Sequence, residues 1–260
     1  MFDDKAVACA MNRYALRIEA LKVDTAFDGK FKVYNVAEYA ARWTPRGEDR
    51  WFVVVGHVWV YPQIDLAGLG PANARLARNV NAWIAPSRKA IRERLACNAS
   101  ITSTWTTLRA VSRNILGSTT EWEDYGDGAV HSMEGVDDRY FDKRRLRSLR
   151  PGDIFQGKEW PTLLGTLAFE ELKKLMGDLL HVKEAGELAP LVSRIDRWTL
   201  RREGLGIHFR EYDVVSYADG MPSVMIPWPE LSGHLTEFAR AEFGVPRNAS
   251  IATPNPGQMP

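Results

Sequence analysis

The sequence contains few of the features that would assign it to a membrane, a nucleic acid or a catalytic mechanism. No run of residues approaches the eighteen or so apolar residues of a membrane span. Its 34 basic and 33 acidic residues leave a formal charge of +1, whereas a surface that binds phosphates normally leaves a basic excess. Glycine-rich phosphate loops, GxSxG elbows, HExxH pairs and cysteine-nucleophile signatures are all missing. The sequence therefore predicts no nucleic-acid partner, no membrane span, no cofactor and no recognisable catalytic class.

Cysteine is scarce, with only Cys9 and Cys97 in 260 residues. Two thiols without CxxC spacing are too few for a zinc site, but they can form one disulfide in an oxidising compartment. The N-terminus, MFDDKAVACAMNRYAL, starts with acidic residues and lacks the order of a signal peptide. Either the protein is cytoplasmic or a leader has been removed. We expect Cys9 and Cys97 to pair only in the second case.

Tryptophan is abundant, with nine residues, and hydrophobic residues make up 45% of the chain. This content is sufficient for a buried core in one or two domains. Because tryptophan occurs in cores, at protein interfaces and in sugar sites, its number favours a role in recognition without naming a ligand.

Residues 51–105 are expected to form an N-terminal lobe made of a strand and a long, kinked helix. The run WFVVVGHVWVY, residues 51–61, is rich in β-branched and aromatic residues and predicts a buried central strand, with His57 as a core residue. Apolar residues at helical spacing in 71–96 predict a helix with a kink or break at Pro86. Residues 1–50 are harder to assign, and their first apolar run fits either a strand or a helix.

The second half of the chain predicts further strands and helices. Residues 106–125 fit one long strand or a hairpin arm, and residues 160–180 an amphipathic helix or a pair of helical turns. A strand at 198–200 precedes a segment, 202–235, with two strands, a turn at Gly220 and a helix. This mixture without a regular βαβ repeat predicts an α+β fold, with an antiparallel β-sheet and packed helices in two lobes. The proline-rich tail, residues 245–260, is expected to be disordered.

Two blocks of residues carry a resemblance to a known family. The first contains Gly204, Leu205, Phe209, Tyr212, Val214, Tyr217, Ala218, Gly220, Val224 to Pro227 and Leu231. The second contains Gly128, Ala129, His131, Phe141, Asp142, Leu149, Asp153 and Phe155. Both resemble the RsiV-like family of bacterial extracytoplasmic domains, catalogued as domain of unknown function 3298. Ser132 and Ser216 depart from it, because a proline is common at both positions. The resemblance implies an RsiV-like C-terminal lobe over residues 106–244.

The resemblance also implies a location and a function. Family members are usually secreted, lipid-anchored or membrane-tethered, which implies a periplasmic or other extracytoplasmic protein. Since no catalytic motif is present, we expect a non-catalytic recognition or sensor domain that binds a protein, such as lysozyme, or a cell-wall glycan. The alternative is an enzyme or accessory domain that acts on cell-wall polysaccharide, because the family also occurs beside polysaccharide deacetylase domains. The oligomeric state stays open.

Two loops next to aromatic residues, 124–132 and 212–222, are the candidate binding site, since loops on a rigid scaffold often carry function. If the two blocks are neighbours in one sheet, Asp124, Tyr125, His131 and Tyr217 form one polar and aromatic surface for a ligand. The alternative is that His131 and Tyr217 only fill local packing.

The acidic residues of the first loop suggest a metal site at first sight. Asp127, Gly128 and Glu134 copy the latter half of a calcium loop. Tyr125, however, occupies a position where that loop needs an oxygen ligand, so no metal site is expected. The following acids, Asp137 and Asp138, are predicted to be solvated turn residues.

Overall fold

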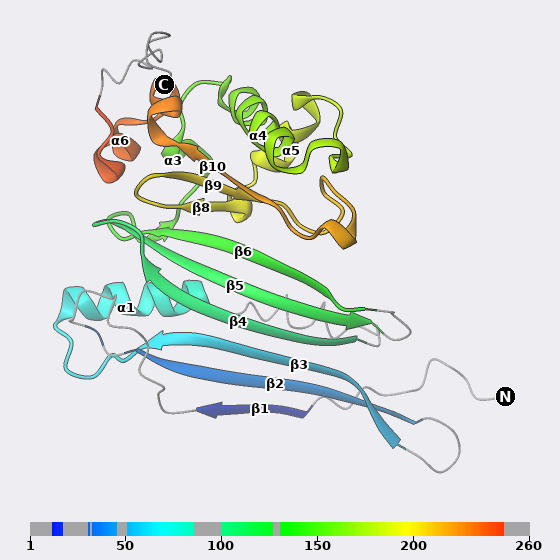
Figure 1. Ribbon diagram of the computed structural model, residues 1–260. Helices are drawn as coiled ribbons and strands as arrows, with labels where there is room; N and C mark the ends of the chain where they lie inside the picture. The colour runs from blue at the N-terminus through cyan, green and yellow to red at the C-terminus, as the bar shows by residue number, and fades with distance from the viewer. Residues whose placement is uncertain are drawn as a thin grey trace, which may run out of the picture. The chain divides into compact units, whose positions relative to one another are not determined.

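The structure is a computed structural model that describes residues 12–17, 31, 33–45, 51–85, 100–126 and 131–246. These residues form two β-sheets and several helices, which confirms the predicted α+β fold (Figure 1). Cys9, Cys97 and the tail from residue 247 lie outside the described residues, as does the side chain of His57.

The chain divides into two compact units, each made of several segments. Unit 1 contains Met1–Arg109, Ser118–Asp137 and Arg145–Arg147. Unit 2 contains Ala110–Gly117, Asp138–Arg144 and Ser148–Pro260. Each unit is described by itself below.

Unit 1 is organised around the predicted central strand. Its elements are β1 (Asn12–Arg17), β2 (Val33–Pro45), β3 (Trp51–Ile64), α1 (Pro71–Ile84) and most of β4 (Ser100–Ala110). β3 pairs with β2 on one side and with β4 on the other, which confirms its central position. The β3–β4 pair is parallel, and such a pair needs a crossover connection, here the one that contains α1.

Helix α1 is attached to the end of β3 and ends where the sequence predicts a break. The Asn81 side chain accepts a hydrogen bond from the Ile64 amide at 2.7 Å and donates one to the Ile64 carbonyl at 2.9 Å. Ala77, Val80 and Ile84 are buried. Ala85 has an extended backbone with ψ of 136°, as expected for a residue that precedes a proline.

The larger sheet continues with β5 (Ile115–Gly126), β6 (Met133–Asp142) and β7 (Arg147–Ser148), in the order β1-β2-β3-β4-β5-β6-β7. The prediction of one strand or hairpin arm over residues 106–125 is wrong, because a turn separates β4 from β5. Ser112 and Asn114 in this turn donate hydrogen bonds from their side chains to the Glu242 carboxylate, each at 2.6 Å. The partner that stabilises the turn is therefore far away in the sequence.

Unit 2 contains the second sheet, in which β10 (Ser223–Pro227), β9 (Gly204–His208) and β8 (Trp198–Leu200) pair antiparallel in that order. Buried side chains from the strands, including Leu205, Ile207 and Ile226, join the same core as residues of α4 (Trp160–Met176). These elements confirm the strands and the amphipathic helix predicted for this part of the chain. Phe155 stacks on Trp160 with ring centroids 5.0 Å apart.

Short helices complete unit 2: α3 (Pro151–Ile154), η1 (Gly177–Leu179), η2 (Ala185–Leu188), α5 (Ala189–Val192), η3 (Ile195–Arg197), η4 (Tyr217–Asp219), η5 (Trp228–His234) and α6 (Glu237–Phe243). The helix predicted after Pro227 is in fact two, because η5 is a 3₁₀-helix and α6 starts anew with Thr236 as its N-cap. In the described part of the chain, no helix combines the length and the apolar character needed to cross a bilayer.

Asp138 is not a solvated turn residue, as the sequence predicted, but a buried residue of β6 with 1% of its surface exposed. Its Oδ2 accepts a hydrogen bond from Thr199 Oγ1 at 2.7 Å. The neighbouring Tyr140 hydroxyl donates to the Trp198 carbonyl at 2.7 Å and accepts from the Leu200 amide at 2.9 Å. These bonds attach β8 to β6 within unit 2.

Candidate functional site

The connection between β9 and β10, residues 209–222 and here called the tyrosine loop, exposes two aromatic rings. It leaves the three-stranded sheet at the right of Figure 1. Tyr212 is 58% and Tyr217 36% exposed, and their rings stack with centroids 6.1 Å apart and an interplanar angle of 28°. The loop therefore presents an aromatic pair, each ring of which supports the other.

Buried residues hold this loop in place. Phe209, Val214 and Val215 belong to the core of unit 2, and the Val214 carbonyl accepts a hydrogen bond from the His181 amide at 2.8 Å. Tyr212 has a φ of 64°, an uncommon value for a residue with a side chain. Such a conformation persists only where the surrounding structure imposes it.

An ion pair fixes the start of the loop. Arg197, only 4% exposed, places Nη1 at 2.6 Å from Asp213 Oδ2, which also accepts a hydrogen bond from the Arg210 amide at 2.7 Å. Beside this pair, Asp196 accepts hydrogen bonds from Arg194, the shorter at 2.6 Å. Burial alone would raise the pKa of Asp196, but the hydrogen bond and charge of Arg194 outweigh burial and hold the pKa below its usual value.

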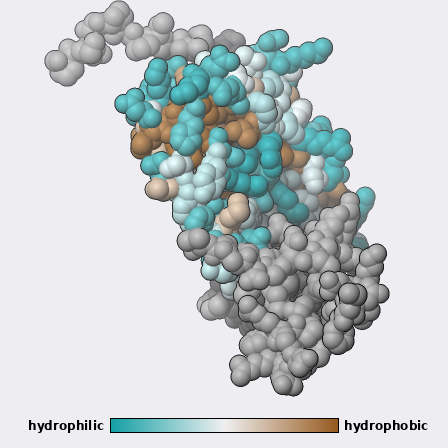
Figure 2. Space-filling model, turned by 90° about the vertical axis from the view of Figure 1, so that its right-hand side faces the viewer, coloured by the Kyte–Doolittle hydropathy of each residue, from teal (hydrophilic) through white to brown (hydrophobic). Residues whose placement is uncertain are grey.

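The surface on the side of the molecule seen in Figure 2 is mixed. This view shows the side that is on the right in Figure 1, and its described surface carries hydrophilic residues together with a hydrophobic area in the upper part. Within the tyrosine loop, Met221 is also exposed, at 40%. An exposed aromatic pair of this kind has the character of a localised contact site.

The residues predicted from the sequence fall into both units. Tyr125, 45% exposed, lies near the end of β5 beside the half-buried Asp124, and the exposed His131 has Nδ1 at 3.1 Å from the Ser132 carbonyl oxygen. These three residues belong to unit 1 and Tyr217 to unit 2. The expectation that the two blocks are neighbours in one sheet is wrong, because β5 and β6 belong to the larger sheet and β9 and β10 to the three-stranded sheet. A single surface made by all four residues stays a prediction. Tyr212 was missed as a site residue, although it occurs in the block that carries the family resemblance.

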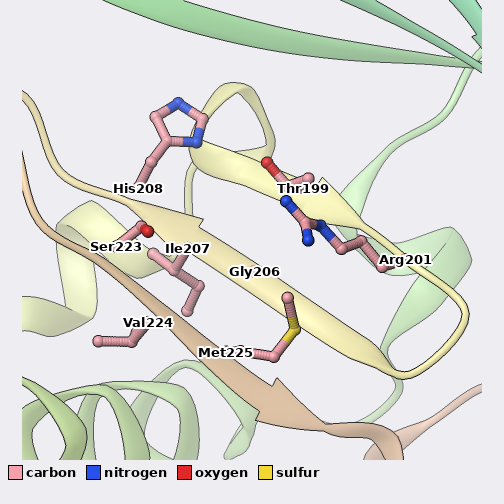
Figure 3. A pocket seen from close by; sticks show the side chains of 8 residues that line it. All are labelled: Thr199, Arg201, Gly206, Ile207, His208, Ser223, Val224 and Met225. Atoms are coloured by element: carbon pink, nitrogen blue, oxygen red, sulfur yellow. The ribbon is translucent and has the colours of Figure 1, made fainter.

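A pocket of about 260 Å³ lies on the three-stranded sheet (Figure 3). Arg201 and His208 contribute the basic side chains, and Thr199 and Ser223 contribute hydroxyl groups. The remaining lining residues are Gly206, Ile207, Val224 and Met225. Among the residues that the structure describes, no three of His, Cys, Asp and Glu gather as metal ligands.

The fold and these features define an α+β protein with an exposed aromatic loop and a small pocket, and two solved structures share the fold. Residues 152–229 match a family model described as "Protein of unknown function (DUF3298)". This segment contains the whole tyrosine loop and all the residues that line the pocket.

Two solved structures of DUF3298 family proteins resemble the chain. The first, from Bacteroides fragilis NCTC 9343, is 13% identical, with a TM-score of 0.50 over 88% of this chain and 95% of that one. The second, from Pseudomonas aeruginosa PAO1, is 15% identical, with a TM-score of 0.51 over 80% of this chain and 96% of that one. At these identities the likeness shows a shared fold. A comparison with curated proteins found no match.

Proposed function

We propose that this protein is a non-catalytic, extracytoplasmic recognition or sensor domain that binds a protein partner through the tyrosine loop. The observation that carries the proposal is the exposed Tyr212–Tyr217 stack, on a loop fixed by the buried Arg197 and its partner Asp213.

The physics of protein interfaces supports this role. Tyrosine is enriched among residues that dominate binding energy, because a large ring with a polar tip is ordered at a small entropic cost. A loop that already has its bound conformation loses little further freedom on association. The ion pair between the buried Arg197 and the half-buried Asp213 and the core residues Val214 and Val215 supply such preorganisation here.

The class of partner follows from the family resemblance. An RsiV-like domain is expected to meet a lysozyme-like protein outside the cytoplasm, which makes lysozyme the first probe. The loop with Asp124, Tyr125 and His131 is proposed as a second contact region. Its exposed tyrosine has the same chemistry as the tyrosine loop.

The test compares the Kd for lysozyme of the wild type and of variants that lose one ring. Tyr217→Ala and Tyr212→Asn are expected to raise the Kd about tenfold or more. Asparagine is chosen at Tyr212 because it tolerates a positive φ. Trp105→Ala, which removes a ring that is 54% exposed on β4 outside both loops, is the control and should leave the Kd unchanged. Tyr125→Ala and His131→Ala test the second loop.

Two results would contradict the proposal. One is an unchanged Kd in both tyrosine-loop variants while their melting temperatures equal that of the wild type. The other is the absence of lysozyme binding together with binding to a glycan array, which would favour an accessory role on cell-wall polysaccharide.

A further inference from the structure

We propose that the pocket on the three-stranded sheet binds a small carboxylated sugar of the uronic-acid class. The proposal rests on the pocket itself and is independent of the tyrosine loop.

The pocket lies on the face of the sheet that is turned away from the core. Thr199, Gly206 and Met225 are directly opposite one another across β8, β9 and β10. Because side chains alternate between the two faces of a sheet, these three share one face, while the buried Leu205 and Ile226 share the other. Gly206 has no side chain, and a Cβ there would lie 3.2 Å from Thr199 Cβ and 3.4 Å from Met225 Cε. The strand backbone therefore forms part of the pocket floor, with the Met225 methyl group beside it.

The charge of the pocket favours an anion. Among the lining residues that the structure describes, Arg201 alone is always charged and none is a carboxylate. Its ion pair with Glu203 is loose, with 3.9 Å between Nη1 and Oε1 and with both side chains more than half exposed, so the guanidinium can exchange it for a ligand. A guanidinium binds a carboxylate through two parallel hydrogen bonds. The single permanent positive charge of Arg201 also neutralises one carboxylate more completely than it neutralises a doubly charged phosphate.

The polar side chains favour a ligand with hydroxyl groups. Thr199 Oγ1 donates a hydrogen bond to the buried Asp138 carboxylate, so the same oxygen can only accept a hydrogen bond from a ligand. Ser223 and His208 are paired in register on neighbouring strands and bring a hydroxyl group and an imidazole to one end of the pocket (Figure 3). Donors and acceptors at several positions suit a ring with several hydroxyl groups.

The size of the pocket limits the ligand to a single ring. Its volume of about 260 Å³ is below the roughly 300 Å³ at which sites for drug-sized ligands begin. The Met225 methyl group offers a small apolar contact for the C–H face of a sugar. A monosaccharide with one carboxylate fits the size, the charge and the hydroxyl pattern together.

The experiment titrates the full chain with four probes and follows the amide NMR shifts of residues 199–208 and 223–225. The probes are glucuronate, glucose, acetate and inorganic phosphate. Glucuronate is expected to bind with a Kd on the order of 1 mM, and each of the others about tenfold more weakly. Arg201→Gln should weaken glucuronate binding about tenfold. Arg202→Gln, which removes the same charge from the next residue outside the pocket lining, should leave it unchanged.

Any of four outcomes overturns the proposal. These are no shift with glucuronate, equal effects of the two arginine variants, equal binding of glucose or acetate, and tighter binding of phosphate than of glucuronate. Lysozyme binding by Arg201→Gln distinguishes the two proposals, because loss of sugar binding with an unchanged Kd for lysozyme affects the pocket alone.

Discussion

Single hydroxyl and carboxylate groups determine how the strands of unit 2 are joined. The Tyr140 hydroxyl forms hydrogen bonds with two backbone groups of β8, and the Asp138 carboxylate accepts a hydrogen bond from the Thr199 hydroxyl. The sequence could not predict either role, because aspartate is seldom fully buried unless it has partners, and those partners are about 60 residues further along the chain.

Tyr140→Phe isolates the contribution of this hydroxyl. The change keeps the buried ring but leaves the Leu200 amide and the Trp198 carbonyl without this partner, and it should lower the free energy of unfolding by about 1–3 kcal/mol. Urea unfolding measures the loss. The control is Tyr212→Phe at a ring that is 58% exposed, for which we expect no measurable change. Equal midpoints for the two variants would contradict the role of Tyr140.

The Glu242 carboxylate, which accepts hydrogen bonds from the turn between β4 and β5, should make the stability of the protein depend on pH under acidic conditions. Burial alone would raise its pKa, but hydrogen bonds from Asn114 and Ser112 outweigh burial and hold the pKa below the usual 4.5. A carboxylate with a lowered pKa in the folded state contributes stability above the usual value, and the contribution is lost as the pH falls through the lowered value.

Stability against pH in the wild type and in Glu242→Gln tests this link. The wild type should be the more stable protein at pH 7, and the difference should shrink steadily as the pH falls below 4.5. Urea midpoints at several pH values give the difference. A difference that stays constant down to pH 2 would refute the link.

At the scale of elements, the strength of the local pattern decided what could be predicted. β3 and α4 were predicted correctly because β-branched runs and helical spacing are local signals. The turn between β4 and β5 was not predicted, because it is stabilised by Glu242, which lies more than a hundred residues away in the sequence. Tyr217 was predicted as a site residue and Tyr212 was not, since neither the positive φ of Tyr212 nor its stacking on Tyr217 has a local sequence signal.

For Gly165 in helix α4, we predict a change in stability opposite in sign to the change that helix propensity alone would give. Gly165→Ala would gain about 1 kcal/mol from propensity alone. The new Cβ, however, would lie 2.8 Å from the Ala185 backbone oxygen, and relieving this overlap should cost more, for a net loss of about 1–2 kcal/mol. Thermal unfolding measures the change. Gly152→Ala in α3 is the control and should not destabilise the protein, because no atom beyond its chain neighbours and its own helix backbone lies within 4 Å of the added Cβ.

At the scale of the whole molecule, unit 2 is not continuous in the sequence. Its core includes Ile115 and Tyr140 in addition to residues from Leu149 onward. A fragment of residues 148–246 lacks the first two and should not fold, whereas residues 110–246 contain every described segment of unit 2 and should unfold cooperatively. Circular dichroism during urea unfolding distinguishes the two fragments. A cooperative transition in the shorter fragment would show that β5 and β6 are dispensable for its core.

The pairing of His208 with Ser223 allows the exposed residues of the tyrosine loop to vary without a change in the strands that hold it. The two residues bracket the tyrosine loop, so neighbouring strands fix the distance between its ends, whatever lies between them. Because Phe209, Val214 and Val215 anchor the loop from within, its exposed positions can be replaced while the anchors remain. We therefore expect that other sequences inserted between His208 and Ser223, with the buried anchors kept, would give the same pair of strands new binding specificities.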